Sequence, residues 1–447
     1  MTRTRLFGYG IGSVGTGVFS TVPGLLLLYF LTDILAVPAA LAGVVVVAPK
    51  AIDVFFNPIV GAASDREAVR TAGRTRILML GAIVLPVAFA AMFLAPGDGA
   101  GAAVWVAGAF VAASLAFACF QVPYVALPAE MSSEPDERLR IMTWRIVFLT
   151  LGILVAGGLA PVVVEAGGGG RAGYVLMGAV VGGVILAACL TATLSTRWVR
   201  SVPGDKPLGF AAAYRTARGN RPFFLLMSVF VIQAMGVATM LAAVPYVATY
   251  WLGDNTLTSA LFVCVVAPSA LAVPLWSALA RKIGRVRCYG IATVVFALAA
   301  VASYPAATAG STAGVLGIAA VLGLCYAALQ VLPLALMPDT IVADAGRTGR
   351  VQAGAFTGAW TAGETAGLAI GPGIYALMLT AGGFLSSTFD DPVTQPGSAK
   401  VALLLGFTAF PALLMVASLP LLRAFRHARS ASAAVGEPGV DHEVRGH

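Results

Sequence analysis

Charged side chains are scarce in this sequence. Asp, Glu, Lys and Arg make up 11% of the 447 residues, whereas hydrophobic residues make up 59% and the mean hydropathy is +0.90. Soluble globular chains carry roughly 25% charged residues. This shortage excludes a soluble globular protein and indicates a chain that lies almost wholly within a lipid bilayer.

The residues and motifs of most enzymes and metalloproteins are also missing. The three histidines lie near the C-terminus and the five cysteines lack paired spacing, so neither a metal site, nor a disulfide framework, nor a cofactor is predicted. No GxxxxGK[ST] motif provides an ATPase motor. Gly10, Gly12 and Gly15 form GxGxxG inside an apolar run with no preceding strand, which favours close helix packing over a dinucleotide site. We therefore predict that the protein is not an enzyme.

Long apolar runs are abundant. A run of roughly 20 residues crosses the ~30 Å of hydrocarbon in a bilayer. About twelve runs of this length occur, with cores near residues 7–31, 40–61, 77–95, 102–126, 142–164, 173–195, 222–251, 257–280, 288–308, 312–337, 352–380 and 401–422. The expected fold is an all-α membrane protein with twelve transmembrane helices.

Positive charge alternates along the chain. Most Lys and Arg residues lie in the N-terminal segment, in every second loop and in the C-terminal tail. Because cytoplasmic loops hold the excess of positive charge, this pattern predicts cytoplasmic termini and a multi-pass protein of the plasma (inner) membrane. The net charge of +8 then reflects contacts with anionic lipid headgroups and does not indicate binding to nucleic acid.

The longest polar connection falls near the middle and divides the chain into two six-helix halves. After the second span of each half come small residues and a basic hairpin, an internal repeat of the kind found in secondary transporters. The expected parts are an N-terminal bundle (1–196), a central cytoplasmic loop (197–221), a C-terminal bundle (222–424) and a disordered cytoplasmic tail (425–447).

Ionisable residues inside the apolar runs give the strongest functional signal. A charge at the bilayer centre costs on the order of 2.5–3.5 kcal/mol on insertion scales, so it usually faces a cavity and a partner. Lys50 and Asp53 share one helical face, which continues through Asn57, Gly61 and Asp65. One interpretation is a neutral pair that ties helices together; the other, which we prefer, is a cation or proton site.

Two further ionisable residues, Arg145 and Glu364, lie in the fifth and eleventh runs. Together with Lys50 and Asp53 they make two positive and two negative charges, so the interior is neutral if all four residues meet. Polar and aromatic residues of other runs are candidates to line the same space, with helix packing as an equal alternative for each: Gln121, Tyr124, Trp144, Gln233, Gln330 and Trp360. Asp33, at the outer end of the first run, is expected at the level of the lipid headgroups.

Four segments, in order along nearly the whole chain, carry a family resemblance. They read LLYFLTDILAV, KAIDVFFNPIVGAASDR, QVPYVALPAEMSSEPDERLRIMTWR and QVLPLALMPDTIVADAGRTGRVQAGAF. They resemble segments of the glycoside-pentoside-hexuronide:cation symporters, the melibiose-permease branch of the major facilitator superfamily. The resemblance implies a twelve-helix alternating-access fold and cation-coupled movement of a solute, most often a sugar.

The site residues depart from the family pattern. Asp53 matches the first of two coupling carboxylates on the second span, but Asn57 stands at the second position. Gly17 and Gln121 replace acids that the resemblance assigns to sugar hydroxyls, and Glu364 replaces a lysine. These losses favour a less hydroxylated, amphiphilic or anionic solute, with the retained Arg145 as an anion partner.

The same departures bear on the coupling ion. A sodium ion needs several oxygen ligands, preferably with net negative charge, and Asp53 paired with Lys50 beside Asn57 is a poor cage for it. A proton needs only one carboxyl whose protonation changes between conformations, and Asp53 or Glu364 meets that need. We therefore expect proton coupling through Asp53, Asn57, Lys50 and Glu364.

Loop charges of both halves form a candidate cytoplasmic gate. The resemblance implies that they lock the inner side in the outward-facing state, and the alternative is solvated loop charge. The candidates are Gly61, Asp65 and Arg66 after the second span, with Asp339, Asp344 and Arg350 after the tenth.

The sequence thus predicts a secondary active transporter, preferably a proton-coupled and less favourably a sodium-coupled symporter of a sugar, glycoside or related small solute. The alternatives are an exporter or antiporter of amphiphilic compounds or lipids, and a non-transporting membrane scaffold or sensor. The expected partners are the solute, the coupling cation and the bilayer, and the chain is expected to act as a monomer.

Overall fold

The computed structural model describes residues 3–132, 134–200, 218–348 and 353–435. Within these ranges the chain is helical apart from short connections, and its only β pairing is an isolated bridge between Leu35 and Thr388. Helices satisfy every backbone polar group within one segment, which is what a chain of long apolar runs needs in hydrocarbon.

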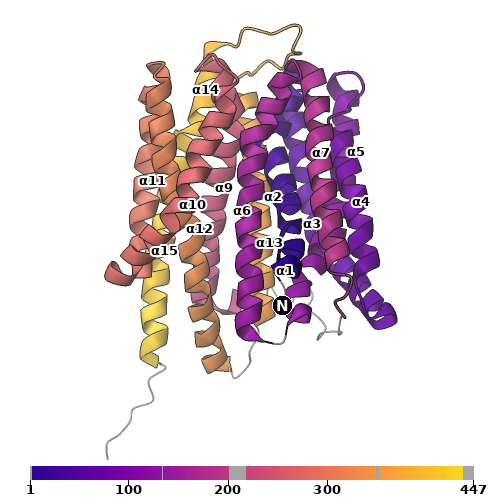
Figure 1. Cartoon of the computed structure of the whole chain (residues 1–447). Coiled ribbons are helices and arrows are strands. Elements are labelled where there is room, and N and C mark those ends of the chain that lie inside the picture. Colours follow the sequence, from indigo (N-terminus) through magenta and orange to yellow (C-terminus); the bar gives the residue numbers. More distant parts are fainter. Residues whose placement is uncertain (1–2, 133, 201–217, 349–352, 436–447) are drawn as a thin grey trace, which may run out of the picture.

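The first half of the chain forms long helices and one interrupted segment at the N-terminus. The elements are α1 (Arg3–Gly10), α2 (Gly12–Val22), the π-helical turns η1 (Pro23–Leu27) and η2 (Phe30–Ile34), α3 (Ala39–Thr71), α4 (Thr75–Met92), α5 (Gly99–Met131), α6 (Pro135–Ala166) and α7 (Gly170–Ser195). Figure 1 shows α3 to α7 side by side as an upright bundle.

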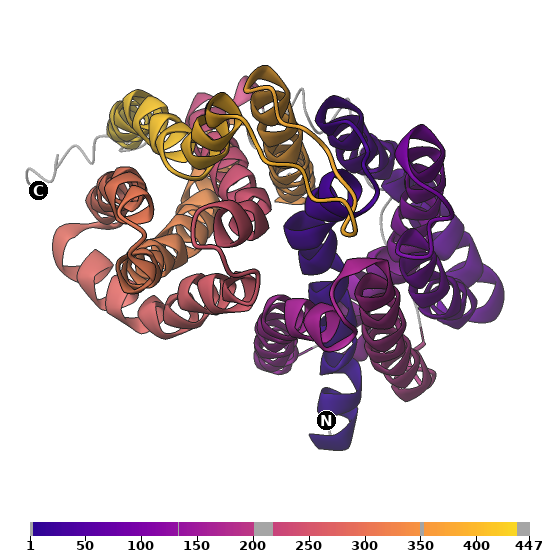
Figure 2. The same cartoon turned by 90° about the horizontal axis from the view of Figure 1, so that it is seen from above.

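The second half repeats this arrangement. Its helices are α9 (Arg221–Tyr250), α10 (Leu257–Ile283), α11 (Arg285–Thr308), α12 (Thr312–Thr348), α13 (Ala353–Ala381), α14 (Gly397–Phe407) and α15 (Ala409–Val435). Seen from above, the elements up to α7 form one group and those from α9 onward form another (Figure 2). We call these the first group and the second group.

Ten helices in the described part of the chain are long and apolar enough to cross a membrane. The predicted spans 40–61 and 352–380 correspond to α3 and α13, which have 33 and 29 residues but do not belong to the ten. Both are enriched in small and polar residues and carry Asp53 and Glu364. They pack on each other, α3 also on α5 and α13 also on α9, so these two helices lie where the two groups meet.

The C-terminal run differs from the expectation at both ends. The predicted span 401–422 is broken at Thr408, because Pro411 has no N–H to donate to the carbonyl of Phe407. Beyond it, α15 continues to Val435, into the segment predicted as a disordered tail. Its Ala and Arg residues favour helix. Most of the predicted central loop (201–217) and residues 436–447 lie outside the described ranges.

Glycines in the first span allow close helix packing. A Cβ atom at Gly12 would lie 2.7 Å from the Cβ of Ala192, and one at Gly15 would lie 2.8 Å from the Sγ of Cys189. Both positions therefore bring α2 against α7, so the GxGxxG pattern serves packing, as the sequence indicated.

One end of the bundle, which holds residues 36–38 and 382–397, joins the two groups by hydrogen bonds. We call it the outer end and the opposite one the basic end. Asp33 of η2 is buried and accepts a hydrogen bond from Tyr250 of α9 (2.5 Å). Thr32 also donates to Asp33 (2.5 Å) and contacts the hydroxyl of Tyr246 at 2.6 Å. Asp33 therefore lies buried between the two groups.

Backbone bonds and small residues strengthen the outer end. Ala36 donates to the carbonyl of Ser387 (3.1 Å), and the Ser387 amide donates to Thr32 (2.9 Å). Gly157 of α6 lies against Phe262 of α10, because a Cβ there would fall within 2.4 Å of three Phe262 ring atoms. The outer end is closed in this structure.

We predict that Gly157→Val opens the outer end. Overpacking costs about 1–3 kcal/mol, which lowers the ratio of closed to open molecules by roughly 30-fold at the middle of that range. The measurement is the distance between spin labels at Glu165 and Asp391 in a cysteine-free background, and it should lengthen. Gly183→Val is the matched control, because a Cβ there meets nothing within 4 Å. Equal distances in both variants would contradict the prediction.

Candidate functional site

Six buried side-chain polar atoms have no hydrogen-bond partner among the described residues. Four belong to predicted site residues: Asp53 Oδ1 of α3, Gln121 Oε1 of α5, Arg145 Nε of α6 and Trp360 Nε1 of α13. The other two are Ser114 Oγ of α5 and Ser259 Oγ of α10. More than about 90% of buried polar groups are bonded to protein or ordered water. Each of these unbonded atoms therefore marks a position where water or a bound solute can supply a hydrogen bond.

The charged face of α3 follows the predicted pattern. Lys50 is half-buried, Asp53 is buried and Asn57 is exposed, at steps of three and four residues. Lys50 and Asp53 interact electrostatically, and the Lys50 ammonium lies 5.9 Å from the ring centroid of Phe19. Because Asp53 Oδ1 lacks a partner, this carboxyl retains bonding capacity.

Arg145 lies on α6, close to the aromatic surface of α5. Its guanidinium is 5.8 Å from the ring centroid of Tyr124 and interacts electrostatically with Tyr124 and Tyr9. The neighbouring Trp144 is half-buried and packs on Phe7 at 4.8 Å. The Arg145 guanidinium therefore lies near an aromatic ring, and its Nε–H donates a hydrogen bond to no described protein atom.

Two predicted substrate residues already have protein partners. Tyr124 is fully buried, donates to the carbonyl of Tyr9 (2.7 Å) and contacts the Ser13 hydroxyl at 2.8 Å. Gln233 is held inside the second group, accepting from Tyr289 (2.7 Å) and donating to Ser418 (2.9 Å). These contacts position α5 and α9. Tyr124 and Gln233 are thus bonded within the protein, unlike the predicted site residues that have unbonded atoms.

The candidate residues of α13 are one turn apart. Trp360 stacks on Phe230 with ring centroids 4.7 Å apart, and Glu364 is half-buried on the same face. Glu364 interacts electrostatically with Tyr326 of α12, whose hydroxyl accepts from Gln330 at 2.6 Å.

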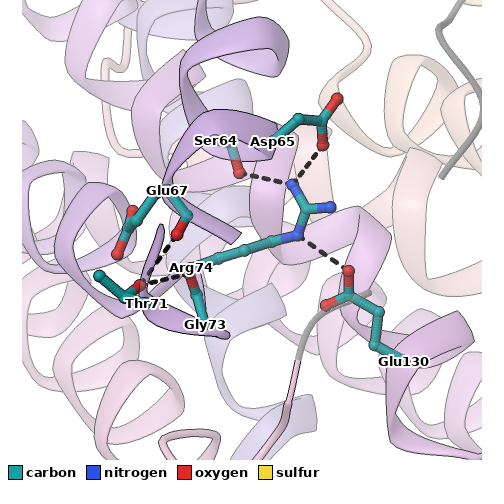
Figure 3. A network of polar contacts seen from close by, with 7 residues as sticks. All are labelled: Ser64, Asp65, Glu67, Thr71, Gly73, Arg74 and Glu130. Atoms are coloured by element: carbon teal, nitrogen blue, oxygen red, sulfur yellow. Dashed lines mark hydrogen bonds and ion pairs between the residues drawn. The ribbon is translucent and has the colours of Figure 1, made fainter. Parts of the chain in front are cut away.

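At the basic end, Arg74 organises the connection between α3 and α4 (Figure 3). The helix α3 ends because Ala72 takes a left-handed conformation, which turns the chain back on itself. Arg74 then donates to Asp65 (2.8 Å), Ser64 (2.7 Å) and Glu130 (2.9 Å). Burial opposes the charge of Arg74, but its bonds to Asp65 and Glu130 outweigh this effect and raise its pKa.

The sequence pattern does not predict this network, because nothing local links Arg74 to Glu130, 56 positions away. In the structure Asp65 pairs with Arg74, whereas Arg66 is exposed. Glu67 accepts from the amides of Arg76 (2.7 Å) and Ile77 (3.0 Å) and so caps α4.

The second group carries its own ion pairs at this end. Asp339 of α12 accepts from Arg429 of α15 (2.9 Å) and Arg285 of α11 (3.4 Å). Asp344 is buried, and Gly61 faces Val122 of α5, 3.8 Å from the position of a Cβ. The predicted gate residue Arg350 lies outside the described residues.

Comparison with known proteins places the chain in a family. The family model described as "MFS/sugar transport protein" matches residues 8–427. The chain belongs to this family. Its members are membrane transporters rather than enzymes, and the protein is a multi-pass protein of the inner membrane.

Curated relatives span most of the chain. An uncharacterized symporter of Synechocystis is 24% identical, covering 94% of this chain and 93% of the relative. The isoprimeverose transporter of Lactiplantibacillus pentosus is 22% identical over 85% and 81%. A putative 2,3-dihydroxypropane-1-sulfonate exporter of Escherichia coli is 26% identical over 78% and 77%. The glycoside-cation symporter resemblance found in the sequence is thereby confirmed.

Solved structures share the fold. A bacterial homologue of the human lysosomal transporter Spinster, in an inward-facing and unoccupied conformation, aligns with TM-score 0.71 and 15% identity, over 98% of this chain and 100% of that one. The nucleoside transporter NupG aligns with TM-score 0.63 and 14% identity, over 96% of this chain and 99% of that one.

We predict that Arg74→Ala destabilises the protein, whereas Arg66→Ala does not. Removing Arg74 breaks its ion pairs with Asp65 and Glu130, and breaking a buried ion pair costs about 3–5 kcal/mol. The lower part of this range is expected because the Asp65 side chain is 37% exposed. The measurement is the thermal unfolding midpoint of purified protein in detergent. Equal midpoints for the two variants would exclude a structural role of the network.

Proposed function

We propose that this chain is a proton-coupled symporter of a sugar, glycoside or related small solute, working by alternating access as a monomer. The observation that carries the proposal is the set of buried polar atoms without partners on Asp53, Gln121, Arg145 and Trp360. A solute site between two groups of helices needs polar atoms that the protein does not itself satisfy.

In this proposal the site residues have separate tasks. Asp53, Lys50 and Glu364, with Asn57 at the exposed end of the same α3 face, handle the coupling ion. Gln121, Trp144, Arg145 and Trp360 contact the solute, while Tyr124 and Gln233 shape its walls through their bonds to Tyr9 and Tyr289. The relatives support the solute class, because they include a putative glycoside/cation symporter of Escherichia coli and an isoprimeverose transporter.

A proton is the preferred coupling ion. Asp53 has a cation, Lys50, within electrostatic range, and Asn57 supplies no negative charge, which is unfavourable for a bound sodium ion. A carboxyl that gains and loses a proton between conformations needs neither a cage of oxygens nor a second acid.

The closed outer end supports alternating access. The Asp33 hydrogen bonds and the Gly157 contact seal that end, so the proposed site faces the basic end in this state. We assign the basic end to the cytoplasm, together with both termini, and count α3 and α13 with the ten apolar spans to give twelve. The gate is then built from Asp65, Arg74, Glu130 and Asp339, with Gly61, Arg66, Asp344 and Arg350 beside them.

Export is the second candidate function. Neutral residues, Gly17 and Gln121, stand where the resemblance places sugar-binding acids, and two relatives are named as putative sulfonate exporters. Symport and export use the same site and differ in the direction in which the gradient drives the solute.

We predict that a transported solute raises the pH of the medium around de-energised cells expressing this chain. Asp53→Asn and Glu364→Gln should abolish this proton uptake, and Asp391→Asn, in an exposed loop, should retain it. The readout is pH in a weakly buffered suspension, with and without sodium. Solute uptake that requires sodium and leaves the pH constant would rule out proton coupling.

A further inference from the structure

Asp33 is a buried carboxyl at the outer end, and no Lys, Arg or His of the described residues forms an ion pair with it. Its bonding partners are hydroxyls: Tyr250 donates to Oδ1, and Thr32 contacts Oδ2, both at 2.5 Å. A carboxylate that is removed from water without a cation is costly, so burial of this kind favours the neutral, protonated form. The setting of Asp33 is that of a proton site.

The titratable groups that face Asp33 within the described residues are tyrosines. They come from its own helical segment, from α7, from α9 and from α13, and they are Tyr29, Tyr174, Tyr246, Tyr250 and Tyr375. A phenol is neutral below about pH 10, so none of them supplies a positive charge. The charged residues Arg171 and Asp98 at the same end are exposed and pair with each other. Asp33 is therefore the group of this cluster whose charge can change near neutral pH.

The hydrogen atoms around Thr32 can be counted. Its hydroxyl oxygen has three oxygen neighbours: Asp33 Oδ2 at 2.5 Å, the Tyr246 hydroxyl at 2.6 Å and the Leu28 carbonyl at 3.2 Å. The hydroxyls of Thr32 and Tyr246 supply only two hydrogens, so one of the three contacts lacks a hydrogen while Asp33 is ionised. A proton on Oδ2 supplies the third. Asp33 then donates to Thr32, Thr32 donates to Leu28, and Tyr246 donates to Thr32.

Closure of the outer end is what removes Asp33 from water. Its tyrosine partners on α9 belong to the second group, whereas Asp33 belongs to the first. The connection between α13 and α14 adds a cover, because the Ser387 amide donates to the carbonyl of Thr32 (2.9 Å). The Ser386 hydroxyl donates to the carbonyl of Val37 (2.7 Å). Figure 2 shows this connection extending toward the first group. Separation of the two groups at this end therefore exposes Asp33 to the outer medium.

We propose that Asp33 is a proton-binding site that links closure of the outer end to the pH of the outer medium. The carboxyl is protonated when the outer end is closed and ionised when it is open. The inference goes beyond the proposed function, because Asp33 is not one of the coupling residues, and it rests only on the alternating-access part of that proposal. The proton enters and leaves on the outer side, since opening of the basic end leaves Asp33 sealed. Asp33 thus sets the balance between open and closed forms and carries no proton across the membrane.

The direction of the pH effect follows from this linkage. In an open outer end Asp33 meets water and is ionised above about pH 4, as aspartates ordinarily are. In the closed end the neutral form is favoured, so closing binds one proton. The closed form is therefore most populated at low pH and is lost as the pH rises. The ratio of closed to open molecules falls by up to about tenfold for each pH unit over the linked range.

The test measures the distance between spin labels at Glu165 and Asp391 in purified, cysteine-free full-length protein between about pH 5 and about pH 9. No solute is added. We expect the short, closed distance to give way to a longer one as the pH rises. Asp33→Asn, whose amide matches the protonated carboxyl in size and can donate to Thr32, should stay closed throughout. Asp98→Asn, which neutralises an exposed acid of the same end, should keep the wild-type pH dependence.

Tyr250→Phe gives an independent reading of the same site. The Tyr250 hydroxyl donates to Asp33 Oδ1, and such a donor stabilises the ionised carboxylate more than the neutral one. Its removal should therefore move the upper limit of the pH range in which the distances change to higher pH. A merely structural role of Tyr250 would lower the closed fraction equally at every pH. This variant keeps the test decisive if Asp33→Asn is unstable.

Distances in the wild type that stay constant over the whole pH range would overturn the proposal. A change with pH that is as steep in Asp33→Asn as in the wild type would also overturn it. Both outcomes leave the proposed symport standing, because symport is judged by proton uptake that a solute drives. A wild type without solute-driven proton uptake would instead refute proton symport and leave the pH-dependent closure at Asp33 intact.

Discussion

The structure depends on the high free-energy cost of a polar atom that is buried in a low-dielectric interior without a partner. Most buried polar side chains of the described residues avoid this cost through hydrogen bonds within the protein, as Gln233 does with Tyr289 and Ser418. The exceptions lie on α3, α5, α6, α10 and α13. A transporter needs such atoms in its substrate site, because polar groups that already hydrogen-bond within the protein are not available to bind a solute.

The same constraint explains where the interior charges lie. The helices α3 and α13 pack on each other where the two groups meet. On these helices Lys50, Asp53 and Glu364 are buried or half-buried rather than exposed, since a charge that faces lipid is costly. Helices with lipid-facing sides, such as α4 and α11, expose leucine and valine instead, as at Leu80 and Leu298.

Much of this architecture could be predicted from the sequence, because span length and the position of a charge within a span are local properties. The apolar runs predicted the helices closely, and the spacing of Lys50, Asp53 and Asn57 on one face holds in the structure. Partners were not predictable in the same way. Glu130 reaches Arg74 across 56 positions, and Asp33 meets Tyr250 across 217, and both pairings arise from helix packing. The polarity of a residue in the sequence also does not reveal whether its side chain is bonded within the protein. Tyr124 forms such hydrogen bonds, whereas the Gln121 side-chain oxygen has no partner among the described residues.

The two ends of the bundle are held by different kinds of bond. At the basic end the contacts are ion pairs, and those of Asp339 with Arg285 and Arg429 are largely exposed. At the outer end the described contacts of Asp33 are hydrogen bonds from tyrosine and threonine hydroxyls in a buried setting. Mobile ions screen exposed charge pairs within about 8–10 Å at physiological ionic strength and act much less on buried contacts. A rise in the salinity of the surroundings therefore weakens the exposed Asp339 ion pairs at the basic end while leaving the buried hydrogen bonds at the outer end intact.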